Sequence, residues 1–100
     1  MPVQSIPGGP GAPVTIVVTG RFDFAVGEEF RRAYSSHPPA SSFVVDLARA
    51  EYLDSSALGM LLLLRRYAGD RPDSVRIVNA SPDVRRILEI AKFERLCIID

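Results

Sequence analysis

Three polar residues in a row, Asp54, Ser55 and Ser56, stand directly before the strongly apolar stretch 57–64. The apolar stretch predicts a buried helix, so the turn that starts it should be rigid and its hydroxyls should stand beside unpaired backbone N–H groups. We expect Ser55 to cap this helix, because a serine oxygen at a helix start accepts a hydrogen bond from such a group. One cap leaves the hydroxyl of Ser56 unexplained. Two interpretations stay open: ordinary helix capping, or a serine that a partner protein recognises and phosphorylates.

Another carboxylate, Asp23, follows the β-branched run Val14–Thr19, which predicts a strand that ends at Gly20. Residues 53–56 likewise follow a predicted strand and precede a helix. In open α/β sheets, binding sites gather at the carboxyl ends of the strands, so we expect both segments at one sheet edge. Asp23 also suits the cap of the helix that follows it, and the two roles are compatible.

The other reactive side chains argue against catalysis and metal binding. The chain has one histidine, His37, and one cysteine, Cys97. His37 precedes two prolines and is expected in solvent, whereas Cys97 lies in an apolar run and is expected to be a small buried residue. A metal site would rest on carboxylates alone, and a Ser-His-Asp triad would need His37 to reach Ser55 or Ser56. We expect neither a cofactor nor an enzyme activity.

Composition narrows the class of protein further. One hundred residues with 47% hydrophobic content suffice for a single domain, residues 1–100, with its own core. Twelve basic and twelve acidic residues give zero net charge, so no overall electrostatic attraction favours binding to nucleic acid or anionic lipid. The glycine-rich N-terminal segment lacks the Gly-Lys-Ser/Thr of a phosphate-binding loop. The sequence has no signal-peptide pattern, no apolar run that could span a bilayer and no cysteine pair, which favours the cytoplasm.

Alternating strands and helices must position these residues. The segment Phe43–Leu47 is nearly continuously apolar, which predicts a central strand covered on both faces, and Gly69 is expected to stop the apolar helix. The order β-β-α-β-α-β-α-β implies an α/β fold: a mixed, mostly parallel sheet with helices packed on it and an antiparallel N-terminal edge. The predicted strands lie near residues 3–6, 14–19, 43–47, 75–78 and 96–99, and the helices near residues 26–34, 56–68 and 81–91.

Four segments carry a resemblance to a known family: Gly20-Arg21-Phe22-Asp23, Phe43-Val44-Val45-Asp46-Leu47, Tyr52-Leu53-Asp54-Ser55-Ser56-Ala57-Leu58-Gly59 and Ile77-Val78-Asn79-Ala80-Ser81-Pro82-Asp83-Val84. From about residue 14 to residue 99 the chain resembles a STAS domain, and more closely the stand-alone bacterial anti-sigma factor antagonists, or anti-anti-sigma factors. The Asp-Ser-Ser-(Gly/Ala)-Leu-Gly motif in its strand-to-helix setting is the most specific part. Ala57 stands where many relatives have glycine, and we expect no loss of function because alanine favours the helix.

The resemblance implies a partner switch. In that family the unphosphorylated protein binds an anti-sigma factor that is also a serine kinase, and the kinase phosphorylates the second serine of the motif, here Ser56. A PP2C-type phosphatase, or a response regulator that carries one, reverses the modification. Asp23 matches an acidic residue near that serine. The residues expected to contact the partner are Asp23, Asp54, Ser55, Ser56, Ala57 and Leu58.

Other functions of the same fold stay open. A constitutive cytoplasmic STAS subunit of a lipid-transport complex would dock through the same helix end without modification. A partner switch could also have an output other than a sigma factor. A nucleotide-binding regulatory domain is a third, weaker interpretation.

Overall fold

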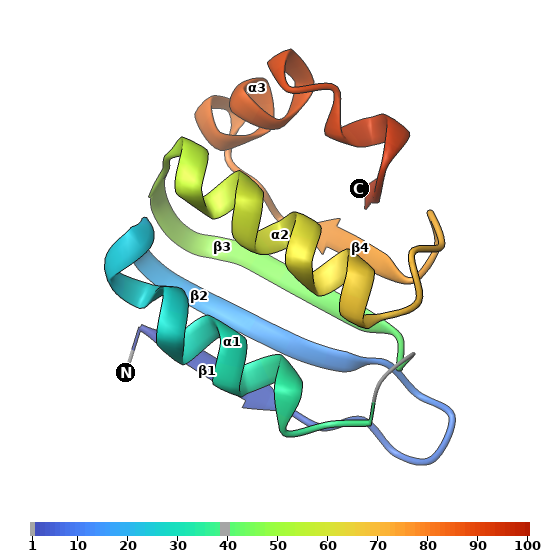
Figure 1. Ribbon diagram of the computed structural model, residues 1–100. Helices are drawn as coiled ribbons and strands as arrows, with labels where there is room; N and C mark the ends of the chain where they lie inside the picture. Colours follow the sequence, from blue (N-terminus) through green and yellow to red (C-terminus); the bar gives the residue numbers. More distant parts are fainter. Residues whose placement is uncertain (1, 39–40) are drawn as a thin grey trace.

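Within residues 2–38 and 41–100, which the computed structural model describes, the chain forms a five-stranded mixed sheet and three α-helices (Figure 1). Two short 3-10 turns, Phe24–Val26 and Phe93–Arg95, precede the first α-helix and the last strand. None of the helices in these residues has both the length and the apolar character that a bilayer crossing requires. The elements are β1 (Val3–Ile6), β2 (Val14–Phe22), α1 (Gly27–Ser35), β3 (Phe43–Leu53), α2 (Ser55–Tyr67), β4 (Val75–Val78), α3 (Pro82–Ile90) and β5 (Ile98–Ile99).

The strands lie in the order β1-β2-β3-β4-β5. β1 pairs with β2 antiparallel, and every other neighbouring pair is parallel. The predicted α/β fold, with a mostly parallel sheet and an antiparallel N-terminal edge, is therefore confirmed. Parallel neighbours need crossover connections, and α1, α2 and α3 supply them.

β2 and β3 run further than the sequence predicted. β2 does not end at Gly20 but continues to Phe22, because Gly20 takes a left-handed conformation (φ 81°) at an irregularity in the pairing with β3. Glycine accepts that conformation without the steric cost of a Cβ, so the strand bends and goes on. At its end, Phe22 pairs with Leu53, and both side chains are buried. The residues that follow them, Asp23 and Asp54, therefore leave the sheet from adjacent strands.

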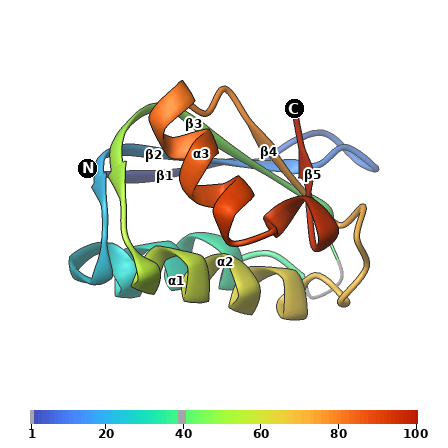
Figure 2. The same cartoon turned by 90° about the horizontal axis from the view of Figure 1, so that it is seen from above.

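Only one face of the sheet carries the core at β3, so the prediction of a strand covered on both faces is wrong. Phe43, Val45 and Leu47 are fully buried, whereas Val44 and Asp46 between them are half-buried. α1 and α2 lie side by side on the same side of the sheet (Figure 2). The near-continuous apolar segment led to the wrong prediction because valine is favourable on a partly exposed sheet surface as well as in a core.

α2 packs on the sheet through one stripe and leaves another to solvent. Its buried residues recur at helical spacing and extend into the C-cap: Ala57, Leu61, Leu64 and Ala68. Leu62 and Leu63, in contrast, are 43% and 53% exposed. The prediction that the helix is buried is therefore wrong for these two leucines. The stop at Gly69 is confirmed, since Gly69 directly follows the C-cap in a left-handed conformation (φ 100°).

His37 is half-buried and hydrogen-bonded, which corrects the expectation that it lies in solvent. Its Nε2 lies 2.7 Å from the hydroxyl oxygen of Ser5 on β1. Its carbonyl accepts a hydrogen bond from the hydroxyl of Tyr67 at the end of α2. His37 thus ties the edge strand to the ends of α1 and α2. α1 ends at Ser35, before His37 and Pro38, yet the side chain of His37 does not extend into water.

The C-terminal segment is only partly a strand. Cys97 is buried as expected, and burial raises the pKa of its thiol to about 11, so it stays protonated at neutral pH. The predicted strand 96–99 shrinks to β5, because Leu96 and Cys97 complete the turn that follows Phe93–Arg95. The backbone N–H groups of Leu96 and Cys97 both donate to the carbonyl of Phe93, which leaves them outside the sheet ladder.

Candidate functional site

The motif residues occupy the turn between β3 and α2. Leu53 ends β3 with a buried side chain, Asp54 takes an extended backbone conformation, and the helix begins at Ser55. The backbone N–H of Asp54 donates to the carbonyl of Phe22, at 3.3 Å, which ties the turn to the end of β2. The side chain of Ala57 is fully buried beneath it. The turn is therefore anchored from the sheet and from the core.

Asp54, not Ser55, caps α2, which corrects the sequence-based assignment. Its Oδ1 accepts the backbone N–H of Ala57 at 2.9 Å. Ala57 is the third helical residue, which is the usual donor to a capping side chain. Ser55 is the first helical residue and is exposed. Asp54, Ser55 and Ser56 can all cap a helix, so the sequence alone does not show which of them does. The extended backbone of Asp54 identifies it as the cap.

Ser56 is the second residue of α2 and is half-buried. Its hydroxyl donates to Asp54 Oδ1 at 2.6 Å. This hydrogen bond is the main cause that lowers the pKa of Asp54 below its ordinary value, helped by the backbone N–H groups of Ala57 and Ser56 and by the positive charge of Arg21. The Asp54 carboxylate is thus ionised at neutral pH and holds both the helix end and the Ser56 hydroxyl.

Asp23 has the capping role that the sequence suggested. Its Oδ1 accepts the backbone N–H of Ala25 at 3.1 Å, at the start of the turn that leads into α1. Its Oδ2 lies 3.3 Å from Nε of Arg21. The guanidinium of Arg21 also stands 4.5 Å from the centre of the Tyr52 ring. The structure therefore brings Asp23 and Asp54 to one sheet edge, as predicted, and adds a cation that sequence reasoning missed.

The six residues expected to contact a partner divide by exposure. Ser55 is exposed, and Asp23, Asp54, Ser56 and Leu58 are half-buried. Ala57 is fully buried, so its side chain supports the turn from beneath and cannot form part of a contact surface. The interaction of the other five with a partner stays a prediction.

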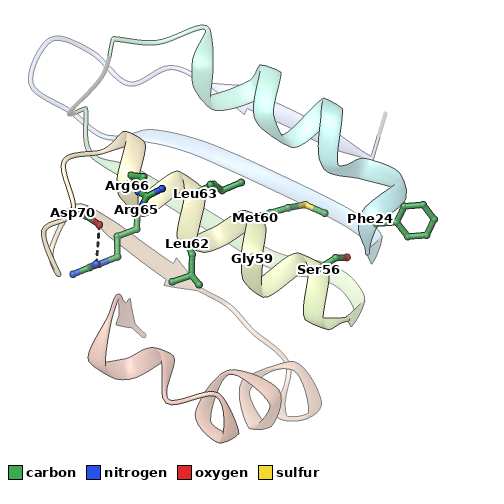
Figure 3. Close-up of a pocket in the computed structure, with 9 residues that line it drawn as sticks. All are labelled: Phe24, Ser56, Gly59, Met60, Leu62, Leu63, Arg65, Arg66 and Asp70. Atoms are coloured by element: carbon green, nitrogen blue, oxygen red, sulfur yellow. Dashed lines mark hydrogen bonds and ion pairs between the residues drawn. The ribbon is translucent and has the colours of Figure 1, made fainter.

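An apolar groove of about 690 Å³ begins at Ser56 and extends along α2 (Figure 3). Ser56 and Phe24 lie at one end, and Arg65, Arg66 and Asp70 lie at the other. Phe24 is 78% exposed, which is unusual for a phenylalanine next to a half-buried polar turn. Sequence reasoning missed this groove, although leucines that fall outside the 57, 61, 64, 68 stripe could have signalled it. The remaining lining residues are Gly59, Met60, Leu62 and Leu63.

The structure separates His37 from the serines. The carbonyl of His37 contacts Tyr67, eleven residues beyond Ser56 on α2. At 1.5 Å of rise per residue, that spacing is about 16 Å along the helix axis. A Ser-His-Asp arrangement at Ser56 is therefore excluded by geometry. Within residues 2–38 and 41–100, no three His, Cys, Asp or Glu side chains gather closely enough to hold a metal ion.

Comparison with known proteins agrees with this fold. The family model described as Mlab, STAS domain matches residues 7–99. The STAS-domain containing protein PA14_20770 of Pseudomonas aeruginosa (strain UCBPP-PA14) is 47% identical over 97 residues, which span 96% of each chain. The chain belongs to the STAS domain family.

Solved structures with the same fold include anti-sigma factor antagonists. One from Mycobacterium paratuberculosis superposes with a TM-score of 0.77 at 18% identity, over 97% of this chain and 82% of that one. The anti-sigma factor antagonist SpoIIAA in its unphosphorylated form superposes with a TM-score of 0.72 at 19% identity, over 98% and 86% of the two chains. The Bacillus cell fate determinant SpoIIAA in its phosphorylated form gives a TM-score of 0.69 at 18% identity, over 98% and 90%. At these identities the likeness concerns the fold.

Proposed function

We propose that this protein is an anti-sigma factor antagonist that binds its partner while Ser56 carries a free hydroxyl and releases it when Ser56 is phosphorylated. One observation carries the proposal. Asp54 caps α2, so the Ser56 hydroxyl is not needed to hold the helix end and yet stands at the edge of an open apolar groove. Membership in the STAS family and the fold shared with anti-sigma factor antagonists support it.

The physical basis of the switch is charge placed at a rigid helix end. A phosphate adds a charge of about −1.5 to −2 at neutral pH. The N-terminus of a helix tolerates an anion, so the fold survives the modification. A partner that covers the groove must instead desolvate the phosphate or meet it with its own charge. A penalty of about 3 kcal/mol weakens binding roughly a hundredfold, which is enough for a switch.

The proposed partner is an anti-sigma factor with serine kinase activity. A PP2C-type phosphatase, or a response regulator that carries one, resets the protein by hydrolysing the phosphate. In this scheme the STAS domain binds and is modified but catalyses nothing itself. The same chemistry serves a switch whose final output is not a sigma factor.

Two substitutions at one position test the proposal. Ser56→Ala removes the phosphate acceptor and adds no charge, so it should bind the anti-sigma factor within a few-fold of the wild type. Ser56→Asp adds about one negative charge and should bind at least tenfold more weakly. Titration calorimetry with the purified anti-sigma factor measures both, and Ile90→Asp on α3 is the control for a charge added away from the predicted contact residues. Equal affinity of Ser56→Ala and Ser56→Asp would leave the motif as a helix cap alone.

Mass spectrometry locates the modification independently. After incubation with the kinase, the phosphate should be on Ser56 and absent from Ser55. Phosphate on Ser55 alone would show that the assignment to the second serine is wrong.

A constitutive structural subunit is the second candidate. The observation that favours it is the matching family model, whose description names Mlab and not an anti-sigma factor antagonist. Such a subunit, for instance in a lipid-transport complex, would dock through the same helix end with no modification. It predicts that Ser56→Ala and the wild type bind equally before and after treatment with the kinase.

A further inference from the structure

We propose that the occupant of the groove on α2 is an amphipathic helix of the partner protein, with apolar residues along its contact face and carboxylates at the end that meets Arg66. This inference deepens the proposed function, because it assigns the kind of segment that binds next to Ser56. The bound segment is expected to be helical, apolar on one face and acidic at one end, whichever protein supplies it.

The face in question is a continuous stripe of α2. Ser56, Met60, Leu63 and Arg66 follow one another at spacings of four, three and three residues, so they lie on one side of the helix. Figure 3 shows Met60 and Leu63 on the side of α2 that faces α1, with Phe24 beyond Ser56 at the end of the stripe. The stripe thus runs from a polar turn, over two apolar side chains, to a cation.

α1 turns this stripe into a furrow. A second depression, of about 170 Å³, adjoins the groove and shares Met60 and Leu63 with it. Its other walls are Gly27, Phe30 and Tyr34 of α1, together with Arg31. A Cβ on Gly27 would lie 3.4 Å from Cε of Met60, within van der Waals contact, which shows how closely the start of α1 approaches α2 here. The middle of the furrow is therefore apolar, with Met60 and Leu63 of α2 on one side and Phe30 and Tyr34 of α1 on the other.

The furrow fits a helix better than an extended strand. Its walls are side chains of two helices, whose backbone groups already bond within each helix. An extended segment would bring unpaired N–H and C=O groups onto an apolar floor and find no sheet edge to pair with. A helix satisfies its own backbone and offers apolar residues at i, i+3, i+4 and i+7, which match the ridge spacing of α2.

The charge at the far end selects acidic residues. Arg65 is already engaged, since it donates to the carbonyl of Leu96 at 2.7 Å and pairs with Asp70 at 3.1 Å. Arg31 pairs with Glu28 at 2.6 Å. Arg66 is exposed and makes no ion pair with any carboxylate in residues 2–38 and 41–100. A partner carboxylate at this end gains a charge-assisted hydrogen bond with Arg66, whereas a partner cation meets like charge.

The opposite end explains why the same segment would sense Ser56. An apolar residue of the bound helix lies over Phe24 and the Ser56 hydroxyl in the unmodified protein. A phosphate at Ser56 puts a charge of about −1.5 to −2 beneath that apolar residue, which the bound helix would have to desolvate. The segment inferred here is therefore one that phosphorylation would dislodge.

Site-specific photo-crosslinking tests the inference whichever protein supplies the segment. p-Benzoylphenylalanine is placed at position 63, in the furrow, and in a second variant at position 90 of α3, where Ile90 is 75% exposed. Irradiation in cells followed by mass spectrometry identifies the partner peptide. We expect position 63 to capture a segment with a helical apolar repeat and Asp or Glu at one end, and position 90 to capture none. A basic or non-helical segment, a second copy of this chain, or no adduct at position 63 would overturn the inference.

Affinity measurements with the captured partner then test each part of the furrow. Leu63→Ala and Arg66→Glu should each weaken binding about tenfold, and Arg66→Lys should stay within about threefold because it keeps the charge. Ile90→Ala and Arg86→Glu on α3 are the matched controls and should bind like the wild type. Unchanged affinity of Leu63→Ala or of Arg66→Glu would overturn the apolar or the electrostatic part. Circular dichroism of each variant verifies that it is folded.

The outcomes separate this inference from the proposed function. An acidic helix from a protein unrelated to sigma factor control would support the furrow and refute the anti-sigma factor assignment. An anti-sigma factor whose binding depends on Ser56, but which is captured from another face, would do the reverse.

Discussion

α2 and α3 begin with the same capping geometry. In each, a capping side chain accepts a hydrogen bond from the backbone N–H of the third helical residue: Asp54 from Ala57 at 2.9 Å, and Ser81 from Val84 at 3.3 Å. In each helix that third residue is buried, as is the leucine four residues later. The first two helical residues differ, since α2 has two serines where α3 has a proline and Asp83.

This difference shows which side chains cap the helix start and which polar groups the cap does not require. At α3 the serine is the cap and the second residue is already acidic, so this fold tolerates a negative charge at that position. At α2 an aspartate takes over the cap, and the serine at the second position is left with a hydroxyl that the helix does not require. Phosphorylation of Ser56 would give α2 an anion where α3 has Asp83.

The largest expected effect tests whether both helix starts are fixed by the core. Leu61 and Leu88 are fully buried, and each is seven residues beyond its cap. Leu61→Ala and Leu88→Ala should each lower the free energy of unfolding by about 2–5 kcal/mol, because each leaves a cavity. Leu62→Ala should cost less than about 1 kcal/mol, since Leu62 is half in solvent. Chemical denaturation measures all three. A cost below about 1 kcal/mol for Leu61→Ala would mean that α2 is not a rigid platform.

The caps should come next in size and should rank in a definite order. Asp54→Ala should cost about 1–2 kcal/mol and Ser81→Ala about 0.5–1 kcal/mol, because the Asp54 carboxylate is charged and accepts two short hydrogen bonds. Ser55→Ala is the matched control and should change the free energy of unfolding by less than about 0.5 kcal/mol. If Ser55→Ala proved costlier than Asp54→Ala, the cap of α2 would have been misassigned.

The two caps should also respond differently to pH. The pKa of Asp54 is lowered in the folded protein, mainly by the hydrogen bond from Ser56, so its charge stabilises the fold above the ordinary value of 3.8 and this contribution is lost as the pH falls below that value. The stability difference between wild type and Asp54→Asn should therefore shrink on going from pH 7 to below the folded pKa. The difference between wild type and Ser81→Ala should stay constant, since serine does not titrate. Urea titrations at several pH values compare them, and a constant Asp54→Asn difference would contradict the assigned cause.

The smallest expected effect is the one most specific to the switch. Ser56→Asp should leave the melting temperature unchanged or raise it slightly, because α3 already carries an aspartate at the equivalent position. Ser56→Ala should also stay within about 0.5 kcal/mol of the wild type. Differential scanning calorimetry measures both. A large drop in melting temperature for Ser56→Asp would mean that phosphorylation acts by unfolding the turn and not by repelling a partner.

The sequence predicted the architecture because its periodic patterns are strong. The order of elements, the antiparallel edge, the stop at Gly69 and the burial of Cys97 all follow from local composition and spacing. Local patterns could not show that Gly20 would bend β2 without ending it, since that depends on the register with β3. They also could not show that His37 would reach Ser5, because the two residues meet only after β1 joins the sheet.

The site was predicted at the level of its location but not of its roles. Strand ends placed Asp23 and Asp54 at one sheet edge, and the parallel pairing of Phe22 with Leu53 confirms this. The choice among three capping residues depends on backbone angles that composition does not determine. The groove was missed because the leucines of a short apolar helix are all predicted to be buried. Only the packing of α2 on the sheet shows which of them stay exposed to solvent.

The hydrogen bond from Ser56 to Asp54 has a stereochemical consequence for the modification. With the hydroxyl oxygen 2.6 Å from Asp54 Oδ1, the serine side chain points at a carboxylate. Esterification removes the shared proton and would leave two anionic groups in contact. On phosphorylation, the χ1 angle of Ser56 would therefore move to another of its three staggered wells, separated by about 120°. The first difference between the proposed two forms would thus be one torsion angle, readable from a three-bond coupling constant, with the backbone of α2 unmoved.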